Sequence, residues 1–313
     1  MYRLGIDLGG TNIAIGIVDE RYRILAGRSV PTALPCESHT IVEKMLCVSR
    51  EVARDAGVAW QDIATAGIGS PGIVDPDTGT VLYASNLGFE NVPLAAAFQS
   101  LCGIPTFVCN DANAAAYAEF CAGAGKGSTN FVAVTLGTGI GGGIVLGSKL
   151  YRGQRGDAGE IGHMILRKNG RKCTCGQRGC LETYASATAL IKDTAAAMHK
   201  DKNSVLWRLC DGDLRRVNGK TAFDAMRMGD ATAATVVQRY AESLGAGLLS
   251  LIRILAPDCI CISGGIAAEG DTLLEPVRAY IHAQGCTTDT KICTAALGGD
   301  AGVIGAAFAM DAK

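Results

Sequence analysis

Short apolar runs at strand spacing alternate with longer segments whose apolar residues recur at helical spacing along most of the chain. Residues 3–19 contain two β-branched runs joined through glycines, which predicts a β-hairpin. The elements predicted after this hairpin are a strand over residues 24–30, a helix over 40–56, a buried strand over 64–69, a helix over 93–101 and a strand over 106–109. This order of strands and helices is typical of an α/β fold.

A second hairpin is predicted near the middle of the chain. Residues 131–136 and 144–146 are apolar, and the segment between them, residues 137–143, is rich in glycine. Two hairpins with glycine-rich bends at corresponding places suggest two related α/β halves that face a cleft. The expected domains are a small one over residues 1–110 and a large one over residues 111–298, with a C-terminal helix of about 299–313 packing on the small domain.

The last part of the chain continues the alternation. Apolar residues recur every three or four positions from Val236 to Leu255, which predicts a long helix that Pro257 ends. The elements predicted after this helix are a strand over residues 259–262, a helix over 273–283, a strand over 291–294 and a helix over 301–310.

The charge balance argues against a polyanionic partner. The formal net charge is −1, whereas proteins that bind nucleic acid or anionic membranes cluster Lys and Arg on one surface. With 48% hydrophobic residues, the 313-residue chain can bury substantial cores without disulfides. We therefore expect a small-molecule partner, and we expect neither nucleic acid nor a membrane as partner.

The cysteines indicate a reducing compartment. The chain has 13 cysteines, and several of them, such as Cys36, Cys109, Cys121 and Cys259, lie in apolar or helical segments, which is typical of reduced core residues. The most apolar run, residues 248–262, contains charged residues and a proline, so it is neither a secretory signal nor a membrane span. We therefore expect a cytoplasmic protein.

One short loop carries four side chains that suit a metal ion. Zn²⁺ prefers soft or borderline ligands at tetrahedral corners, and a closed set of four is normally structural. Glu160 and Glu182 flank the loop, so a metal that fixes the loop would also aim both carboxylates. Three free cysteines in a mobile loop, or one disulfide with a cysteine left over, are the alternatives. The candidate ligands are His163, Cys173, Cys175 and Cys180.

Two glycine-rich turns are candidate phosphate loops. In Asp7-Leu-Gly-Gly-Thr-Asn12 and in residues 136–143, small residues expose backbone N–H groups that can surround an anionic oxygen. A Rossmann fingerprint does not fit, because it opens a helix whereas both turns join strand to strand. An ordinary Gly-Gly hairpin is the alternative for either turn. Ser263-Gly-Gly-Ile266 offers a third close backbone approach, which suits packing beside a nucleoside.

Asp111 is the candidate general base. It follows Asn110 at the end of a predicted strand and precedes an alanine-rich helix. An amide and a carboxylate at a strand end can hold a hydroxyl group and accept its proton, as phosphoryl transfer to an alcohol requires. The alternative is that Asp111 is only the N-cap of the helix, a position for which Asp is well suited.

Together these motifs resemble the ROK family (repressor, ORF, kinase), and most closely its bacterial glucokinases. The resemblance runs from residue 4 to roughly residue 307, and the cysteine motif between its two glutamates is the most specific part. The glycine loops alone would indicate only the wider actin-like ATPase and sugar kinase fold. The matching segments, in order, are Asp7-Leu-Gly-Gly-Thr11, Asn110-Asp111, residues 136–143, Glu160-Ile-Gly-His163, residues 173–182 and Ser263-Gly-Gly265.

The resemblance implies a two-domain α/β kinase of the actin-like ATPase (sugar kinase/ribonuclease H-like) fold, with an interdomain cleft that closes on a hexose. ATP and Mg²⁺ would be co-substrates, and Zn²⁺ would be structural. Asp111 would take the proton from the 6-hydroxyl of the sugar, and His163 would place one ring nitrogen on zinc and the other on the sugar. The residues implied to bind the sugar are Asn86, Asn110, Asp111, Glu160, His163 and Glu182. Those implied to contact ATP are Asp7 (near Mg²⁺), Gly9, Gly10, Thr11, Asn12, Gly137, Thr138, Gly139, Gly264 and Gly265.

Two features bear on the substrate and on the class of protein. Where many family members have a tryptophan after Asn-Leu-Gly, this chain has Phe89, an apolar replacement that makes the sugar specificity less certain. Repressors of the family carry a DNA-binding domain before the first glycine loop, and only six residues precede Asp7 here, so we expect an enzyme. We expect it to convert glucose to glucose 6-phosphate, with N-acetylmannosamine, fructose or another hexose as alternative substrates and a non-catalytic sugar sensor as the alternative class. The resemblance also implies a homodimer or homotetramer.

Overall fold

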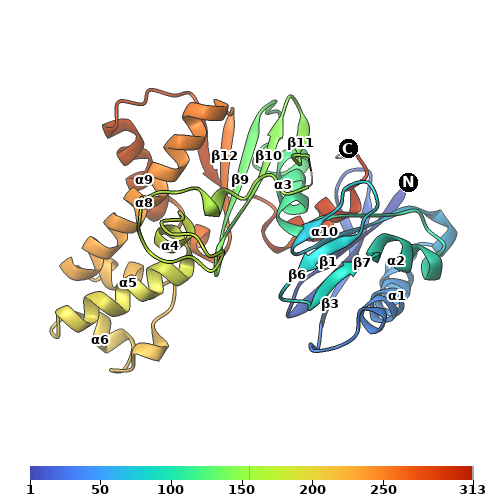
Figure 1. Ribbon diagram of the computed structural model, residues 1–313, viewed down its shortest axis with the longest axis horizontal. Helices are drawn as coiled ribbons and strands as arrows, with labels where there is room; N and C mark the ends of the chain where they lie inside the picture. The colour runs from blue at the N-terminus through green and yellow to red at the C-terminus, as the bar shows by residue number, and fades with distance from the viewer. Residues whose placement is uncertain (155, 312–313) are drawn as a thin grey trace. The chain divides into compact units, whose positions relative to one another are not determined.

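The computed structural model describes residues 1–154 and 156–311, which form two compact units (Figure 1). Unit 1 contains Met1–Thr129, Gly143–Gly159 and Ala296–Lys313, and unit 2 contains Asn130–Gly142 and Glu160–Ala295. Their extents differ from the expected domains, because residues 111–129 and 143–159 group with unit 1. Within the described residues, no helix has the length and apolar character needed to span a membrane.

Unit 1 is built on a five-stranded sheet with the strand order β3-β2-β1-β4-β8. The hairpin predicted at residues 3–19 is confirmed, because the first two strands pair antiparallel and join through a short glycine turn. The third strand pairs antiparallel with the second, while the last two run parallel to the first. The strands are β1 (Tyr2–Leu8), β2 (Asn12–Asp19), β3 (Ile24–Pro31), β4 (Ile63–Ser70) and β8 (Thr106–Asn110).

Side chains alternate between the two faces of this sheet, as the pleat of a strand requires. Leu4, Ile6 and Leu8 are buried in one core with residues of the helices α1 (Ser38–Asp55) and α2 (Leu94–Cys102). Gly5 and Asp7 of the same strand therefore point to the opposite face, which contacts α3 (Asp111–Ala122) and α10 (Ala301–Ala307).

Glycines let the C-terminal helix α10 lie directly on the sheet. A Cβ atom at Gly5 would lie 2.0 Å from Val303 O, and one at Gly67 would lie 1.7 Å from Ala306 O. Any side chain at these two positions would clash with the helix backbone. Consequently the last helix of the chain covers the strands that the first residues form, on the face that carries Asp7.

Unit 1 also contains a small antiparallel sheet that the sequence pattern did not predict. Its strands are too short for their alternation to be recognised: β5 (Ile73–Val74), β6 (Val81–Ala84) and β7 (Phe89–Val92). The turn between the last two strands carries Asn86. Phe89 is 3% exposed and belongs to the same core as α1, so the residue that replaces the expected tryptophan packs inward.

Unit 2 contains three parallel strands, β9 (Phe131–Leu136), β12 (Cys259–Ser263) and β13 (Lys291–Thr294). The strand β10 (Ile140–Leu146) follows β9 in the strand order, and its later residues belong to unit 1, where they pair antiparallel with β11 (Lys149–Tyr151). Because β10 begins at residue 140, the glycine bend is shorter than the predicted 137–143.

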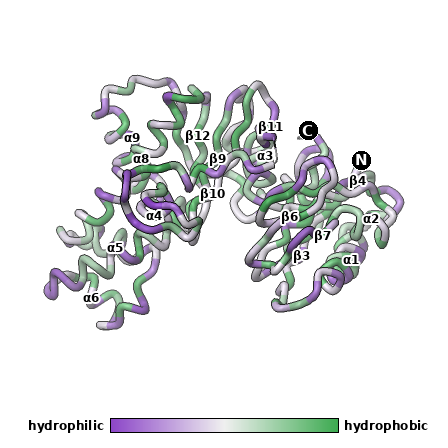
Figure 2. Tube along the Cα trace, in the orientation of Figure 1, coloured by the Kyte–Doolittle hydropathy of each residue, from purple (hydrophilic) through white to green (hydrophobic). Residues whose placement is uncertain are grey.

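Helices make up most of the rest of unit 2. The long predicted helix is present as α8 (Ala231–Leu255), where Asp230 accepts a hydrogen bond from Ala233 N at 2.7 Å and so caps its first turn. Figure 2 colours β12 as hydrophobic and the loop around α4 (Glu182–Ala185) as largely hydrophilic. The helices are α4 (Glu182–Ala185), α5 (Ala187–Lys200), α6 (Leu206–Leu209), α7 (Thr221–Arg227), α8 (Ala231–Leu255) and α9 (Asp271–Ala283). The first four were not predicted.

Candidate active site and metal centre

Two carboxylates with altered acidity lie together in unit 1, at the end of β1 and the start of α3. Burial raises the pKa of Asp7 to about 6, and the negative charge of Asp111 adds to this rise. Burial also raises the pKa of Asp111, while backbone N–H groups that donate to its carboxylate oppose the shift. A carboxyl group whose pKa lies nearer neutrality is better suited to accept a proton than an ordinary aspartate.

The side chain of Asn110 caps α3. Its Oδ1 accepts a hydrogen bond from Asn113 N at 3.1 Å, which is the N-cap interaction, and its Nδ2 donates to Gly72 O at 3.0 Å. Asp111 is already the first helical residue, and its Oδ1 accepts from Ala112 N at 2.8 Å. The alternative in which Asp111 serves as the N-cap is therefore wrong. Capping does not explain why an aspartate stands at this partly buried position.

The first glycine turn is closed by its own backbone. Gly9 N donates to Asn12 O at 2.9 Å, and Thr11 and Asn12 are exposed beyond it. Asn86 lies against this turn, because a Cβ atom at Gly10 would lie 3.5 Å from Asn86 Nδ2. The structure thus brings one predicted sugar ligand beside one predicted nucleotide loop.

The second glycine turn lies in unit 2, against the side chain of Glu182. Glu182 Oε2 accepts a hydrogen bond from Ile140 N at 3.1 Å, and a Cβ atom at Gly139 would lie 2.1 Å from the same oxygen. Thr138, at the tip of the turn, is exposed. Gly264 has a φ of +89° and approaches β9 so closely that a Cβ atom there would lie 2.3 Å from Leu136 O. This close approach explains the glycine after β12.

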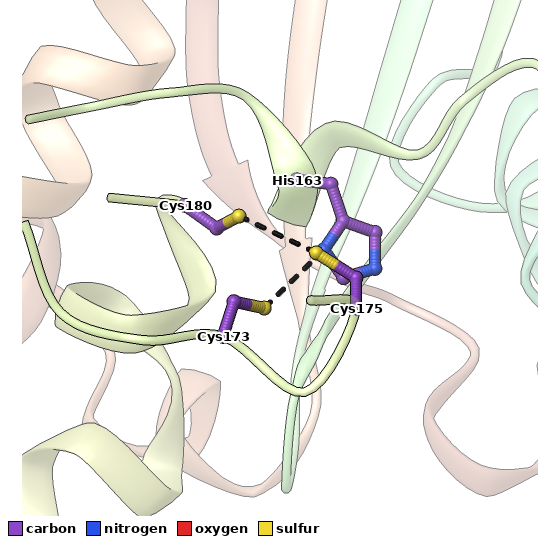
Figure 3. A group of neighbouring side chains, drawn as sticks. All are labelled: His163, Cys173, Cys175 and Cys180. Atoms are coloured by element: carbon purple, nitrogen blue, oxygen red, sulfur yellow. Dashed lines mark hydrogen bonds between the residues drawn. The ribbon is translucent and has the colours of Figure 1, made fainter. Parts of the chain in front are cut away.

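The four predicted metal ligands converge in unit 2 (Figure 3). One ligand atom from each of His163, Cys173, Cys175 and Cys180 lies within 4.8 Å of all the others. His163 Nδ1 is 3.7 Å from Cys173 Sγ, and the sulfurs of Cys175 and Cys180 are 3.7 Å apart. A disulfide would need about 2.05 Å between sulfurs, so the alternative of a disulfide between these two cysteines is not supported.

These separations fit a tetrahedral zinc ion. Zn–S bonds of about 2.3 Å place two sulfur ligands about 3.8 Å apart at the corners of a tetrahedron. The histidine ring is oriented as such a site requires, with Nδ1 towards the thiols and Nε2 at 3.7 Å from Glu160 Oε2. The donor set and its spacing therefore fit Zn²⁺, and the second ring nitrogen of His163 stays directed away from the sulfurs.

The thiols differ in acidity. Burial raises the pKa of Cys180 to about 12 and also raises that of Cys173, whereas a backbone hydrogen bond from Gln177 lowers the pKa of the exposed Cys175. Zinc binds thiolates, so loading this cluster would release protons from the two buried thiols. Cys173 Sγ also lies 3.4 Å from Glu182 Oε1, so the metal cluster and the second glycine turn share Glu182 as a neighbour.

The predicted site residues form two sets, one in each unit. Unit 1 holds Asp7, Gly9, Gly10, Thr11, Asn12, Asn86, Asn110 and Asp111. Unit 2 holds Gly137, Thr138, Gly139, Glu160, His163, the three cysteines, Glu182, Gly264 and Gly265. Gly302 was not among the predicted residues. A Cβ atom there would lie 2.2 Å from Asp7 Oδ2, and the Gly-Gly-Asp-Ala-Gly run at 298–302 was a visible signal.

Comparisons with known proteins agree on one family. The ROK family model matches residues 3–313. A glucokinase of Streptomyces coelicolor (strain ATCC BAA-471 / A3(2) / M145) is 37% identical over 310 residues, which cover 97% of this chain and 96% of that protein. An N-acetylmannosamine kinase of Escherichia coli O1:K1 / APEC is 32% identical over 310 residues, 98% of each chain. Among solved structures, a ROK family glucokinase from Streptomyces griseus in complex with glucose and AMPPNP is 36% identical, with a TM-score of 0.82 and 98% of each chain covered.

Proposed function

The chain belongs to the ROK family, and we propose that it is an ATP-dependent kinase that converts glucose to glucose 6-phosphate. Its two-unit α/β fold is the predicted actin-like ATPase fold, which its structural neighbours share. Glucokinases 35% and 37% identical to the chain over nearly its whole length support the activity and the substrate. The observation that carries the proposal is the partly buried Asp111, whose pKa is raised and whose capping position is taken by Asn110.

In this proposal Asp111 is the catalytic base. Its carboxylate accepts the proton of the sugar 6-hydroxyl as the oxygen attacks the γ-phosphorus of ATP, and ADP leaves. Burial raises the pKa of Asp111, so the group holds a proton more readily than a solvated aspartate. Asn110 would position the hydroxyl, because its amide is fixed at both ends by Asn113 N and Gly72 O.

Each unit contributes binding groups in this proposal. The sugar hydroxyls would bind Asn86 and Asn110 of unit 1 and Glu160, His163 and Glu182 of unit 2. The phosphates of ATP would bind the backbone N–H groups of the two glycine turns, and Gly264 and Gly265 would pack beside the nucleoside. Mg²⁺, when bound, would offset the charge of the phosphates. Asp7 would lie near this ion.

The cluster of His163 and three cysteines would hold a structural Zn²⁺. Its spacing supports the proposal, and so does the direction of the histidine ring, because Nδ1 faces the thiols while Nε2 remains available to the sugar. The bound ion would fix the loop that carries Glu160 at one edge and Glu182 at the other. In this way one metal site would orient two residues that bind the sugar.

Turnover of a panel of hexoses tests this function. ADP release should be fastest with glucose and should require ATP and Mg²⁺. N-Acetylmannosamine belongs in the panel because a kinase for that sugar is 32% identical to this chain, and fructose completes the panel as a third hexose. A faster reaction with another hexose would replace glucose as the substrate, whereas sugar binding without ADP release from any hexose would show a non-catalytic sensor.

A further inference from the structure

A small cavity in unit 1 is lined in part by Asn110, whose amide is proposed to bind the sugar. It is bounded by the end of β5, the end of β8, the first turn of α3 and the segment that follows β11. The space open to the centre of a water molecule is about 10 Å³, which is close to the room that one water needs. Its lining includes Val74, Cys109, Asn110, Asn113, Leu150 and Arg152.

Three polar atoms of the lining residues lack a partner in the part of the chain that the structure describes. They are Nε and Nη2 of Arg152 and Oδ1 of Asn113, and all three are buried. Buried polar groups are nearly always hydrogen-bonded, because leaving one unpaired is costly. Cys109 offers no counter-charge, since burial raises the pKa of its thiol to about 12 despite the opposing effect of the Arg152 charge.

The orphaned atoms are complementary to one water molecule. A water can accept hydrogen bonds from the two Arg152 donors and donate one to Asn113 Oδ1, which makes three bonds, the usual number for a buried water. The cavity is large enough for one such molecule, and the three unpartnered atoms belong to residues that line it.

The same residues hold Asn110. Asn113, which is 4% exposed, donates its backbone N–H to Asn110 Oδ1 at 3.1 Å. Gly72 O accepts a hydrogen bond from Asn110 Nδ2 at 3.0 Å, and Gly72 lies two residues before Val74, which lines the cavity. The Asn110 amide is therefore bonded at one end to Asn113, which lines the cavity, and at the other end to Gly72, so a shift of Asn113 would rotate or displace this amide.

We propose that Arg152 is a positioning residue, which orients Asn110 for the sugar through a buried water and Asn113. Arg152 does not touch the substrate in this account. It holds the first turn of α3, and with it the amide that receives a sugar hydroxyl. The inference rests on the proposed function in one respect, because it assumes that Asn110 binds the sugar.

The test compares Arg152→Met with Arg3→Met. Methionine keeps the length of the arginine stem but removes the donors, so we expect the KM for glucose to rise about tenfold while the KM for ATP stays within about twofold. Arg152→Lys keeps one donor group and should recover part of the loss. Arg3 is a matched control in the same unit, since it is largely buried and its guanidinium pairs with Asp311 at 2.8 Å. Arg3→Met should lower the Tm and leave both KM values unchanged.

The outcomes separate this inference from the proposed function. A parent enzyme that phosphorylates no hexose refutes the proposed function. An active parent whose glucose KM is the same in Arg152→Met, whatever its Tm, refutes the role of Arg152. A high-resolution crystal structure of the parent decides the case in which Arg152→Met does not fold: a water bonded to Arg152 and Asn113 supports the inference, and a cavity without that water overturns it.

Discussion

Replacing Gly139 with alanine tests the role of Glu182 without touching its side chain. The new Cβ atom would lie 2.1 Å from Glu182 Oε2, a separation that two such atoms cannot occupy. Neither Gly139 nor Gly137 has a positive φ, so alanine fits the backbone at both positions. Because the carboxylate is the free end of a flexible side chain, we expect it to swing away and the protein to fold.

The displaced carboxylate would lose its hydrogen bond from Ile140 N, which is 3.1 Å long, and its contact with Cys173 Sγ at 3.4 Å. A hydrogen bond to a charged group contributes ~1.5–3 kcal/mol, and a sugar hydroxyl bound by the same carboxylate would lose a similar amount. This corresponds to a rise of about 10- to 150-fold in the KM for glucose.

Gly137→Ala is the matched control. It adds the same methyl group to the same turn, but no heavy atom lies within 4 Å of the new Cβ atom. We expect its KM for glucose to stay within about twofold of the parent. Both variants would be titrated with glucose at saturating ATP in an ADP-release assay. A parental glucose KM in Gly139→Ala would refute Glu182 as a sugar ligand, and equal losses in both variants would show that the turn itself requires glycine.

Three further predictions follow from the two sets of site residues. Asp111→Asn should lower kcat by roughly 10²-fold or more, because an amide can bind the sugar hydroxyl but cannot take its proton. Calorimetry should still show a glucose affinity within about tenfold of the parent. Near-parental turnover of the variant would refute Asp111 as the catalytic base. Purified protein should contain about one zinc per chain by metal analysis, and Cys175→Ala should release it and raise the glucose KM; native protein without zinc would contradict the metal site. The pKa of Asp7 is raised from 3.8 to about 6, so the protonated group favours the folded state at low pH and that contribution, ~3 kcal/mol, is lost as the pH rises through about 6. In the parent, the free energy of unfolding measured in urea should therefore fall between pH 4 and 6, and Asp7→Asn should remove this fall. An unchanged pH dependence in the variant would refute the raised pKa of Asp7.

The sequence predicts best those features that a few neighbouring residues determine. The hairpin at residues 3–19 shows in the apolar alternation, and the convergence of His163 with the three cysteines shows in their spacing, because each depends on one short segment. The helix α8, which ends just before Pro257, could also be predicted, because neighbouring residues determine both its apolar face and its end.

Features that depend on distant contacts were not predictable in this way. Nothing near Glu182 indicates that its carboxylate accepts from Ile140 N, 42 residues away in the chain. The capping roles of Asn110 and Asp111 could not be separated either, because both residue types cap well and only the backbone shows where α3 begins. The strands β5 to β7 are held by packing rather than by alternation, and no periodic signal exists in two to four residues.

The placement of α10 sets a constraint on how the protein can be synthesised. This helix covers the sheet face of β1 and β4, with Gly5 and Gly67 shaped to receive it, yet about 185 residues separate its end from the end of α3. At roughly 5–20 residues per second, translation would need about 10–40 s to supply it. During that interval the nascent chain would present an open sheet face and the unshielded Asp7 carboxylate, while all of unit 2 emerges and can fold. Unit 1, although it starts at the N-terminus, would therefore be the last to become native, and its half-finished sheet is the species that chaperones or proteases would meet.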